Sequence, residues 1–169
     1  MQIDYFTRAL RAAALVTALS ASAAHAFDLT DTQGQRHRLA DYKGRYVVLN
    51  FWATWCVPCI QEIPEIAQFR KDHGGVVVIG VAIDAEDVAK VKQFALKVGH
   101  DYPLVIGNDR VEKQLGAMRA LPTTRIYDPK GKVVYDKPGR VDRKLLEEKT
   151  ASQAVSAQRS FQARRTRFG

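Results

Sequence analysis

Apolar side chains fill nearly every position of two short stretches, residues 46–52 and 76–83. Both stretches are rich in β-branched and aromatic residues, and a continuous apolar run of this length predicts a strand that is buried on both faces. We therefore expect both strands inside a sheet, and parallel. Shorter apolar runs predict three more strands, at residues 102–106, 123–127 and 132–135.

Between these runs, apolar residues recur at helical spacing. After the first strand, isoleucines at every third position predict one face of a helix that begins at Cys56. Gly74 and Gly75 are expected to end this helix. Pro64 is expected to kink it, because its ring removes one backbone hydrogen bond. Three further helices are predicted, at residues 85–98, 110–116 and 140–149.

The alternation of strands and helices predicts a single α/β domain over residues 27–149, in which helices flank a mixed central sheet. Residues 27–38 are expected to form an N-terminal β-hairpin with Gly34 in its turn. Residues 39–44 connect this hairpin to the sheet. Arg125 is a lone charge in an apolar strand, and we expect its side chain to point outward into solvent.

The first 26 residues have the pattern of a secretory signal peptide. Arg8 and Arg11 precede an apolar run at residues 12–24, and small residues at positions 24 and 26 form a cleavage signal. An uncleaved membrane anchor is the alternative. The run of about thirteen residues is shorter than the roughly 20 that a spanning helix needs. We therefore expect cleavage and a periplasmic location, with a membrane-anchored form left open.

Lys and Arg number 26 against 18 Asp and Glu, so the formal net charge is +8. The basic excess is strongest in residues 150–169, which carry four arginines and no acidic residue. We expect a flexible, solubilising tail there, with attraction to an anionic membrane or an acidic partner as the alternative. The rest of the chain has no continuous basic stripe, which argues against nucleic acid as a partner.

The chain has only two cysteines, Cys56 and Cys59, at the junction of a predicted strand and helix. The loop between them is too short for a structural disulfide to gain much stability by closing it. At the start of a helix, unpaired N–H groups and the helix dipole favour a thiolate, the nucleophile in disulfide exchange. We therefore assign attack to Cys56 and resolution to Cys59, with no cofactor beyond this dithiol.

Other uses of a Cys-x-x-Cys pair fit less well. A c-type haem site needs His directly after the second Cys, where this chain has Ile60. A metal site needs about two more ligands, and the four histidines are scattered, so no metal is expected. A thiol peroxidase of the peroxiredoxin type would carry a Pro before Cys56, which is absent. A metal-delivery module and a binding domain with an incidental dithiol stay open.

The longest motif surrounds the cysteine pair: residues 50–64 read Asn-Phe-Trp-Ala-Thr-Trp-Cys-Val-Pro-Cys-Ile-Gln-Glu-Ile-Pro. Leu-Pro-Thr-Thr at residues 121–124 and Asp-Pro-Lys-Gly-Lys-Val-Val at residues 128–134 accompany it. Together these segments resemble the TlpA/ResA-like branch of the thioredoxin superfamily. The resemblance implies a thioredoxin-like fold with a central β–α insert, matched here by residues 102–116, and an exported reductase that faces the membrane.

The resemblance implies roles for further residues. Pro122 matches the cis-proline that faces the dithiol, and a cis bond would leave the backbone of Leu121 free to pair with an extended substrate. Glu62 matches a glutamate linked to the proton chemistry of the buried cysteine, where burial would raise its pKa. The alternative for Glu62 is a solvated helix glutamate. Asn50 replaces the buried Asp of thioredoxin itself, and Trp55 is expected at a rim that shields the dithiol.

The two residues between the cysteines, Val57 and Pro58, carry no charge. A cation there would stabilise the reduced thiolate and make the protein an oxidant. Its absence, with the resemblance, favours a reductant of protein disulfides, with apocytochrome c before haem attachment as a candidate partner. We expect the protein to be a monomer. A membrane electron donor would restore the reduced state. A disulfide oxidant or isomerase is the alternative.

Overall fold

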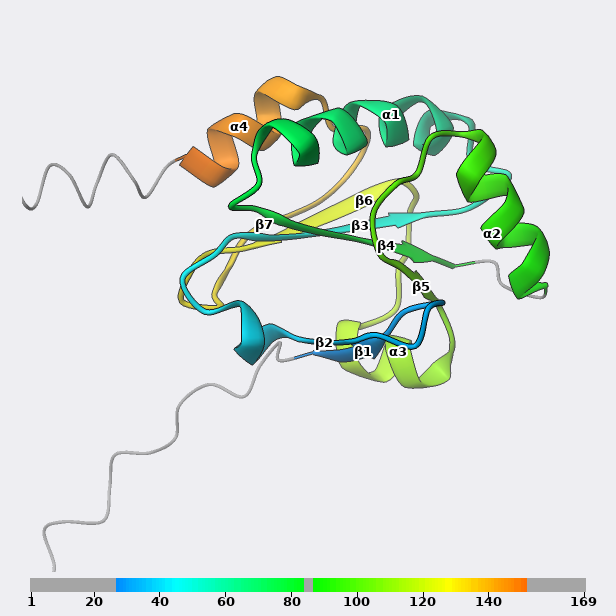
Figure 1. Cartoon of the computed structure of the whole chain (residues 1–169), viewed down its shortest axis with the longest axis horizontal. Helices are drawn as coiled ribbons and strands as arrows, with labels where there is room; N and C mark the ends of the chain where they lie inside the picture. Colours follow the sequence, from blue (N-terminus) through cyan, green and yellow to red (C-terminus); the bar gives the residue numbers. More distant parts are fainter. Residues whose placement is uncertain (1–26, 84–86, 152–169) are drawn as a thin grey trace, which may run out of the picture.

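Figure 1 shows the computed structural model of the chain, which describes residues 27–83 and 87–151. The predicted signal peptide at residues 1–26 and the basic tail from residue 152 onward lie outside the described residues. Among the residues that are described, no helix combines the length and the apolar character that a membrane span needs.

A five-stranded mixed sheet, ordered β5-β4-β3-β6-β7, forms the centre of the molecule. The two continuous apolar stretches form β3 (Val47–Trp52) and β4 (Val77–Ala82), which run parallel inside the sheet with every residue buried, as predicted. Strand β5 (Leu104–Ile106) is parallel to β4. On the other side, β6 (Thr123–Tyr127) is antiparallel to β3, and β7 (Val133–Pro138) is antiparallel to β6.

Helices cover both faces of this sheet (Figure 1). One face carries α1 (Val57–Asp72), α2 (Val88–Lys97) and α4 (Arg143–Ala151). The opposite face carries a hairpin of β1 (Asp28–Thr30) and β2 (Arg36–Arg38), a short 3₁₀ helix (Leu39–Tyr42) and α3 (Asp109–Leu115). Successive side chains of a strand point to opposite faces, so β3 contributes to the cores on both sides of the sheet.

The order of the elements agrees with the prediction, and most differences concern where helices begin. Helix α2 begins at Val88 because the side chain of Asp87 caps it. Helix α4 begins at Arg143 because the carboxylate of Asp142 accepts the N–H of Leu145 at 2.8 Å. In both cases a capping carboxylate stands inside the stretch that hydrophobic spacing alone assigned to the helix.

The prediction that Arg125 points into solvent is wrong, because its side chain is only 8% exposed. Its Nε and Nη2 donate to the carboxylate of Asp136 in β7, at 3.0 and 2.8 Å. Its Nη1 donates to the carbonyl of Leu115 at the end of α3, at 2.7 Å, and the guanidinium lies 5.7 Å from the ring centroid of Phe51 in β3. Arg125 is buried because it joins three elements that the local strand pattern does not reveal.

We expect Arg125→Met to lower the free energy of unfolding by about 2–3 kcal/mol, because it leaves a buried carbonyl and a carboxylate without their donor. Arg38→Met is the matched control, since Arg38 forms an exposed ion pair with Asp41 at 2.8 Å and such pairs contribute little. Denaturant unfolding of both variants measures the difference. Equal losses in the two variants would contradict a structural role for the buried guanidinium.

Candidate active site

Cys56 and Cys59 lie where β3 ends and α1 begins, at one end of the sheet. Cys56 is the N-cap residue of α1, and its Sγ accepts the backbone N–H of Cys59 at 3.3 Å. A disulfide joins the two residues, whose Cα atoms are 5.2 Å apart. Both are buried in an apolar cluster with Trp52 and Ile63. The helix N-terminus would stabilise a thiolate on Cys56 once the pair is reduced.

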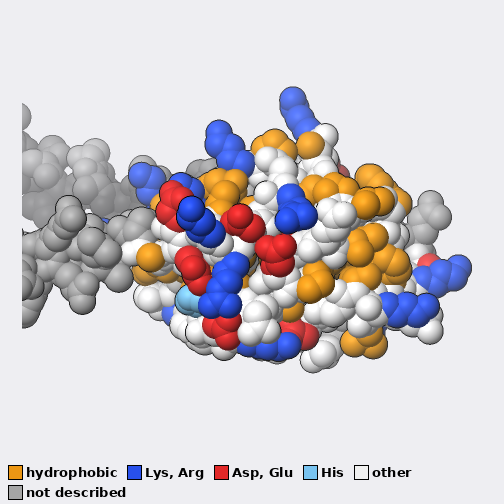
Figure 2. Space-filling model, turned by 90° about the horizontal axis from the view of Figure 1, so that it is seen from above, with side chains coloured by type: hydrophobic (Ala, Val, Ile, Leu, Met, Phe, Trp, Pro, Cys, Tyr) orange, Lys and Arg blue, Asp and Glu red, His pale blue; other side chains and the backbone are white. Residues whose placement is uncertain are grey.

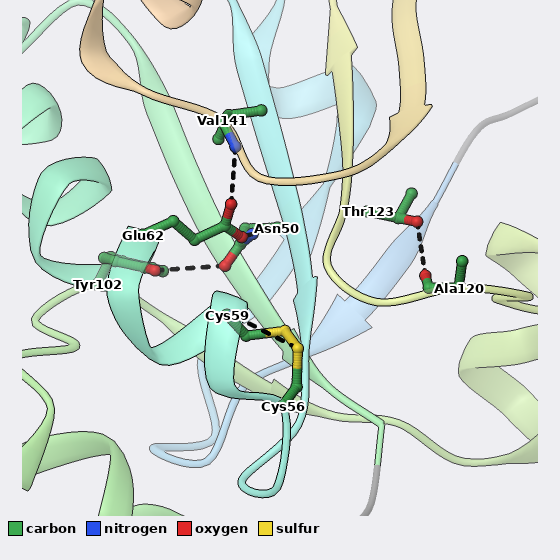
Figure 3. The surroundings of a disulfide bond; sticks show 8 residues. All are labelled: Asn50, Cys56, Cys59, Glu62, Tyr102, Ala120, Thr123 and Val141. Carbon is green, nitrogen blue, oxygen red and sulfur yellow. Dashed lines mark hydrogen bonds between the residues drawn. A yellow bond between two sulfur atoms is a disulfide. The ribbon is translucent and has the colours of Figure 1, made fainter.

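Glu62 lies one helical turn after Cys59 and is completely buried. Its Oε1 accepts the side-chain N–H of Asn50 at 2.6 Å, and its Oε2 accepts the backbone N–H of Val141 at 2.8 Å (Figure 3). Residues three apart share a helix face, so Glu62 lies on the same inward face of α1 as Cys59. Its burial excludes the alternative of a solvated helix glutamate. Its neighbour Glu65 lies at the surface instead, beside Arg140 at 3.4 Å.

Burial raises the pKa of Glu62 from its ordinary value of 4.5 to about 7. The hydrogen bonds from Val141 and Asn50 favour the carboxylate and oppose this rise, as does the nearby charge of Arg140. The acid and the carboxylate of Glu62 are therefore both populated near neutral pH. A group in this state can accept or donate a proton beside Cys59.

A loop that ends at Pro122 forms the other side of the site. The Leu121–Pro122 peptide bond is cis, which confirms the prediction for this proline. Leu121 packs against the apolar cluster that contains both cysteines. The hydroxyl of Thr123 donates to the carbonyl of Ala120 at 2.7 Å and closes the loop where β6 begins (Figure 3).

The two side chains next to Cys56 in the chain are apolar and exposed. Trp55 is 68% exposed and Val57 is 64% exposed, whereas Trp52 is fully buried in the core, as expected. Figure 2 shows hydrophobic side chains gathered over the end of the molecule where α1 begins, and charged ones over the end that carries α4. An exposed apolar patch beside a reactive group is typical of a surface that receives another protein.

Sequence reasoning does not single out two contributors to this site, Tyr102 and Val141. The hydroxyl of Tyr102 donates to Oδ1 of Asn50 at 3.5 Å. Val141 contributes a backbone N–H, which no side-chain pattern can reveal. Within residues 27–83 and 87–151, no group of three or more His, Cys, Asp or Glu residues is arranged to hold a metal ion.

Comparison with known proteins places this geometry in a family. The model of the AhpC/TSA family matches residues 21–136. The chain is 37% identical over 122 residues to the thiol-disulfide oxidoreductase ResA of Bacillus subtilis, a match that covers 71% of this chain and 68% of the relative. It is 42% identical over 117 residues to ResA of Geobacillus kaustophilus, covering 66% of this chain and 65% of that relative. The chain thus spans about two thirds of the length of these relatives.

A solved structure supports the same assignment. The pneumococcal exposed lipoprotein thioredoxin Etrx1 from Streptococcus pneumoniae superimposes with a TM-score of 0.63 at 28% identity, covering 73% of this chain and 97% of that one. This superposition supports a thioredoxin-like fold for the chain. The chain therefore belongs to the AhpC/TSA family and is a thiol–disulfide oxidoreductase of the ResA type, with Cys56 and Cys59 as its cysteine pair.

Proposed function

We propose that this protein is a reductant of disulfides in proteins outside the cytoplasm. The observation that carries this direction is the charge distribution around the dithiol. The residues between the cysteines, Val57 and Pro58, are uncharged, and the buried carboxyl group of Glu62 follows Cys59 by one turn of α1. Neither arrangement stabilises a reduced, thiolate form, and destabilising that form makes a dithiol more reducing.

The reaction begins with the pair reduced. The thiolate of Cys56 attacks one sulfur of the substrate disulfide, forms a mixed disulfide and expels the other substrate sulfur as a thiolate. Cys59 then transfers its proton to the Glu62 carboxylate and attacks the sulfur of Cys56. This step releases the second substrate sulfur as a thiolate and leaves the Cys56–Cys59 disulfide. Two electrons have passed from the dithiol to the substrate, and a second reductant must return them.

The surroundings of the dithiol support a protein substrate. Trp55 offers a large exposed apolar surface next to Cys56 in the chain, and Leu121 packs against the cluster that contains both cysteines. We assign substrate contact to Trp55 and Leu121, and place Pro122 with Cys56, Cys59 and Glu62 in the reactive site. The exposed location that Etrx1 carries in its name, together with the N-terminal signal pattern, supports a periplasmic location.

We also propose an electron donor, an oligomeric state and a substrate for this protein. A membrane electron donor returns the two electrons, the protein acts as a monomer, and apocytochrome c before haem attachment is among its substrates. The resemblance of residues 50–64 to the TlpA/ResA-like motif supports these assignments. A Cys-x-x-Cys-His peptide is the matching probe, because c-type haem attaches at that motif.

We expect the reduced protein to reduce a disulfide-bonded Cys-x-x-Cys-His peptide rapidly and stoichiometrically. The reverse assay, in which the oxidised protein is mixed with the same peptide in dithiol form, is expected to leave the peptide largely reduced. Thiol counting by mass spectrometry after acid quenching measures both directions. Net oxidation of the peptide would overturn the reductant assignment in favour of a disulfide oxidant or isomerase.

A further inference from the structure

The side-chain amide of Asn50 lies between a hydrogen-bond acceptor, the carboxyl group of Glu62, and a hydrogen-bond donor, the hydroxyl of Tyr102. Its Nδ2 donates to Oε1 of Glu62 at 2.6 Å, while its Oδ1 accepts the hydroxyl of Tyr102 at 3.5 Å (Figure 3). Asn50 is completely buried and Tyr102 is 5% exposed, so both ends of the amide are shielded from bulk solvent. The orientation of this amide therefore depends on Tyr102 and Glu62 themselves.

An amide can turn over and exchange the positions of its oxygen and its NH2 group. If Asn50 turned over, its oxygen would face Glu62, which would repel the carboxylate and accept a hydrogen bond from the protonated acid. The hydroxyl of Tyr102 could then accept a hydrogen bond from the NH2 group, but it would lose Oδ1 of Asn50, the acceptor of its own proton. With the amide as it stands, the NH2 group favours the ionised form of Glu62.

Tyr102 is built to remain a hydrogen-bond donor. Burial raises the pKa of its hydroxyl well above the usual value, so the proton stays in place at neutral pH. Its ring packs against His100, with the ring centroids 3.8 Å apart and the ring planes tilted by 33°, and burial lowers the pKa of His100 to about 4. The imidazole beside Tyr102 therefore stays neutral throughout the pH range in which Glu62 titrates.

We propose that Tyr102 is a positioning residue that holds the Asn50 amide with its NH2 group toward Glu62, and so keeps Glu62 available as a proton acceptor for Cys59. The effect of Tyr102 on catalysis rests on the proposed function of Glu62 as proton acceptor. The effect of Tyr102 on the ionisation of Glu62 is independent of that function and can be measured without any substrate. Nothing in the cysteine motif itself points to this residue.

Other groups also face Glu62, and a change at Tyr102 leaves them in place. The backbone N–H of Val141 donates to Oε2 at 2.8 Å. Arg140, from the same loop, lies near the surface and contacts Gln61 and Glu65 at 3.2 and 3.4 Å. Cys59, one turn earlier on α1, is held in the disulfide of the oxidised protein and does not titrate. In that state, Glu62 is the titrating group of interest at this site.

The test is a titration of the Glu62 carboxyl by ¹³C NMR in the oxidised protein, with the signal assigned through Glu62→Gln. We expect Tyr102→Phe to raise the midpoint by about one pH unit, the size expected for loss of one hydrogen bond that favours the carboxylate. Tyr46→Phe is the matched control, because Tyr46 belongs to the same apolar cluster and its buried hydroxyl has no hydrogen-bond partner among the described residues. This control is expected to leave the midpoint unchanged.

A second experiment uses Asn50→Ala, which removes the amide. If Tyr102 acts through the amide, Tyr102→Phe is expected to cause no further shift in an Asn50→Ala background. An unchanged midpoint in Tyr102→Phe, an equal shift in Tyr46→Phe, or a full shift without the amide would each overturn the proposal. If Tyr102→Phe shifts the titration midpoint of Glu62 as expected but leaves the rate of disulfide exchange unchanged, the positioning of Asn50 by Tyr102 holds. The assignment of Glu62 as proton acceptor then fails.

Discussion

Replacing Cys56 by serine is expected to abolish disulfide exchange, with a rate loss of at least about 10³-fold. Cys56 caps α1, where the free N–H groups and the helix dipole stabilise a thiolate, and serine cannot supply an equivalent nucleophile at neutral pH. Cys59 is fully buried and does not offer a second point of attack. Reduction of a disulfide-bonded peptide, followed by thiol labelling, measures the loss.

Cys59→Ser is the matched variant and is expected to behave differently. The first attack by Cys56 is retained, and resolution is lost, so a mixed disulfide between Cys56 and the substrate accumulates. Intact-mass spectrometry after alkylation detects this adduct, and peptide mapping locates it. Full turnover by Cys59→Ser, or an adduct located on Cys59 in the Cys56→Ser variant, would contradict the assigned roles.

Glu62→Gln is expected to slow the resolving step by about 10²-fold at pH 8, the usual size of a lost general base. The carboxylate form accepts the proton, so the wild-type rate of this step rises with pH through the pKa of about 7, and the variant lacks that rise. A preformed mixed disulfide on Cys56 isolates resolution from the titration of the attacking thiol. Glu65→Gln, which changes a surface glutamate one turn away, is the control.

Glu62→Gln is also expected to change how the free energy of unfolding depends on pH. Because the folded-state pKa of Glu62 is raised from 4.5 to about 7, the native state binds more protons than the unfolded state between these values. The stability of the wild type therefore falls as pH rises through this window, by about 3 kcal/mol in total. Glu62→Gln should lack this fall when unfolding is followed at pH 4.5 and pH 8. An equal change in the free energy of unfolding between pH 4.5 and pH 8 in the two proteins would contradict a strongly raised pKa of Glu62.

Much of the fold can be predicted from the hydrophobic pattern because buried strands and helices leave periodic signatures. Residues 46–52 and 76–83 are apolar at nearly every position, and they form the two interior parallel strands β3 and β4. The start of α1 is equally clear from sequence, since it combines a buried strand, a Cys-x-x-Cys pair and a proline in the first turn. Local pattern and local structure agree at these places.

The prediction fails where a residue is placed by contacts that are distant along the chain. Arg125 has the charge of a surface residue, yet Asp136 and the carbonyl of Leu115 satisfy it inside the protein. The site shows the same limit. Glu62 is predictable from its helical spacing to Cys59, whereas the contributions of Tyr102 and Val141 depend on tertiary contacts that have no local signature.

The reduction potential of the Cys56–Cys59 pair tests the reductant assignment most directly. Equilibration of residues 27–169 in graded thiol–disulfide buffers, with the free thiols counted at each ratio, measures it. We predict a value of about −270 mV or lower, in the range of thioredoxin, because Val57 and Pro58 between the cysteines are uncharged and do not stabilise the reduced pair. A value near about −120 mV, typical of a strong disulfide oxidant, would contradict the account.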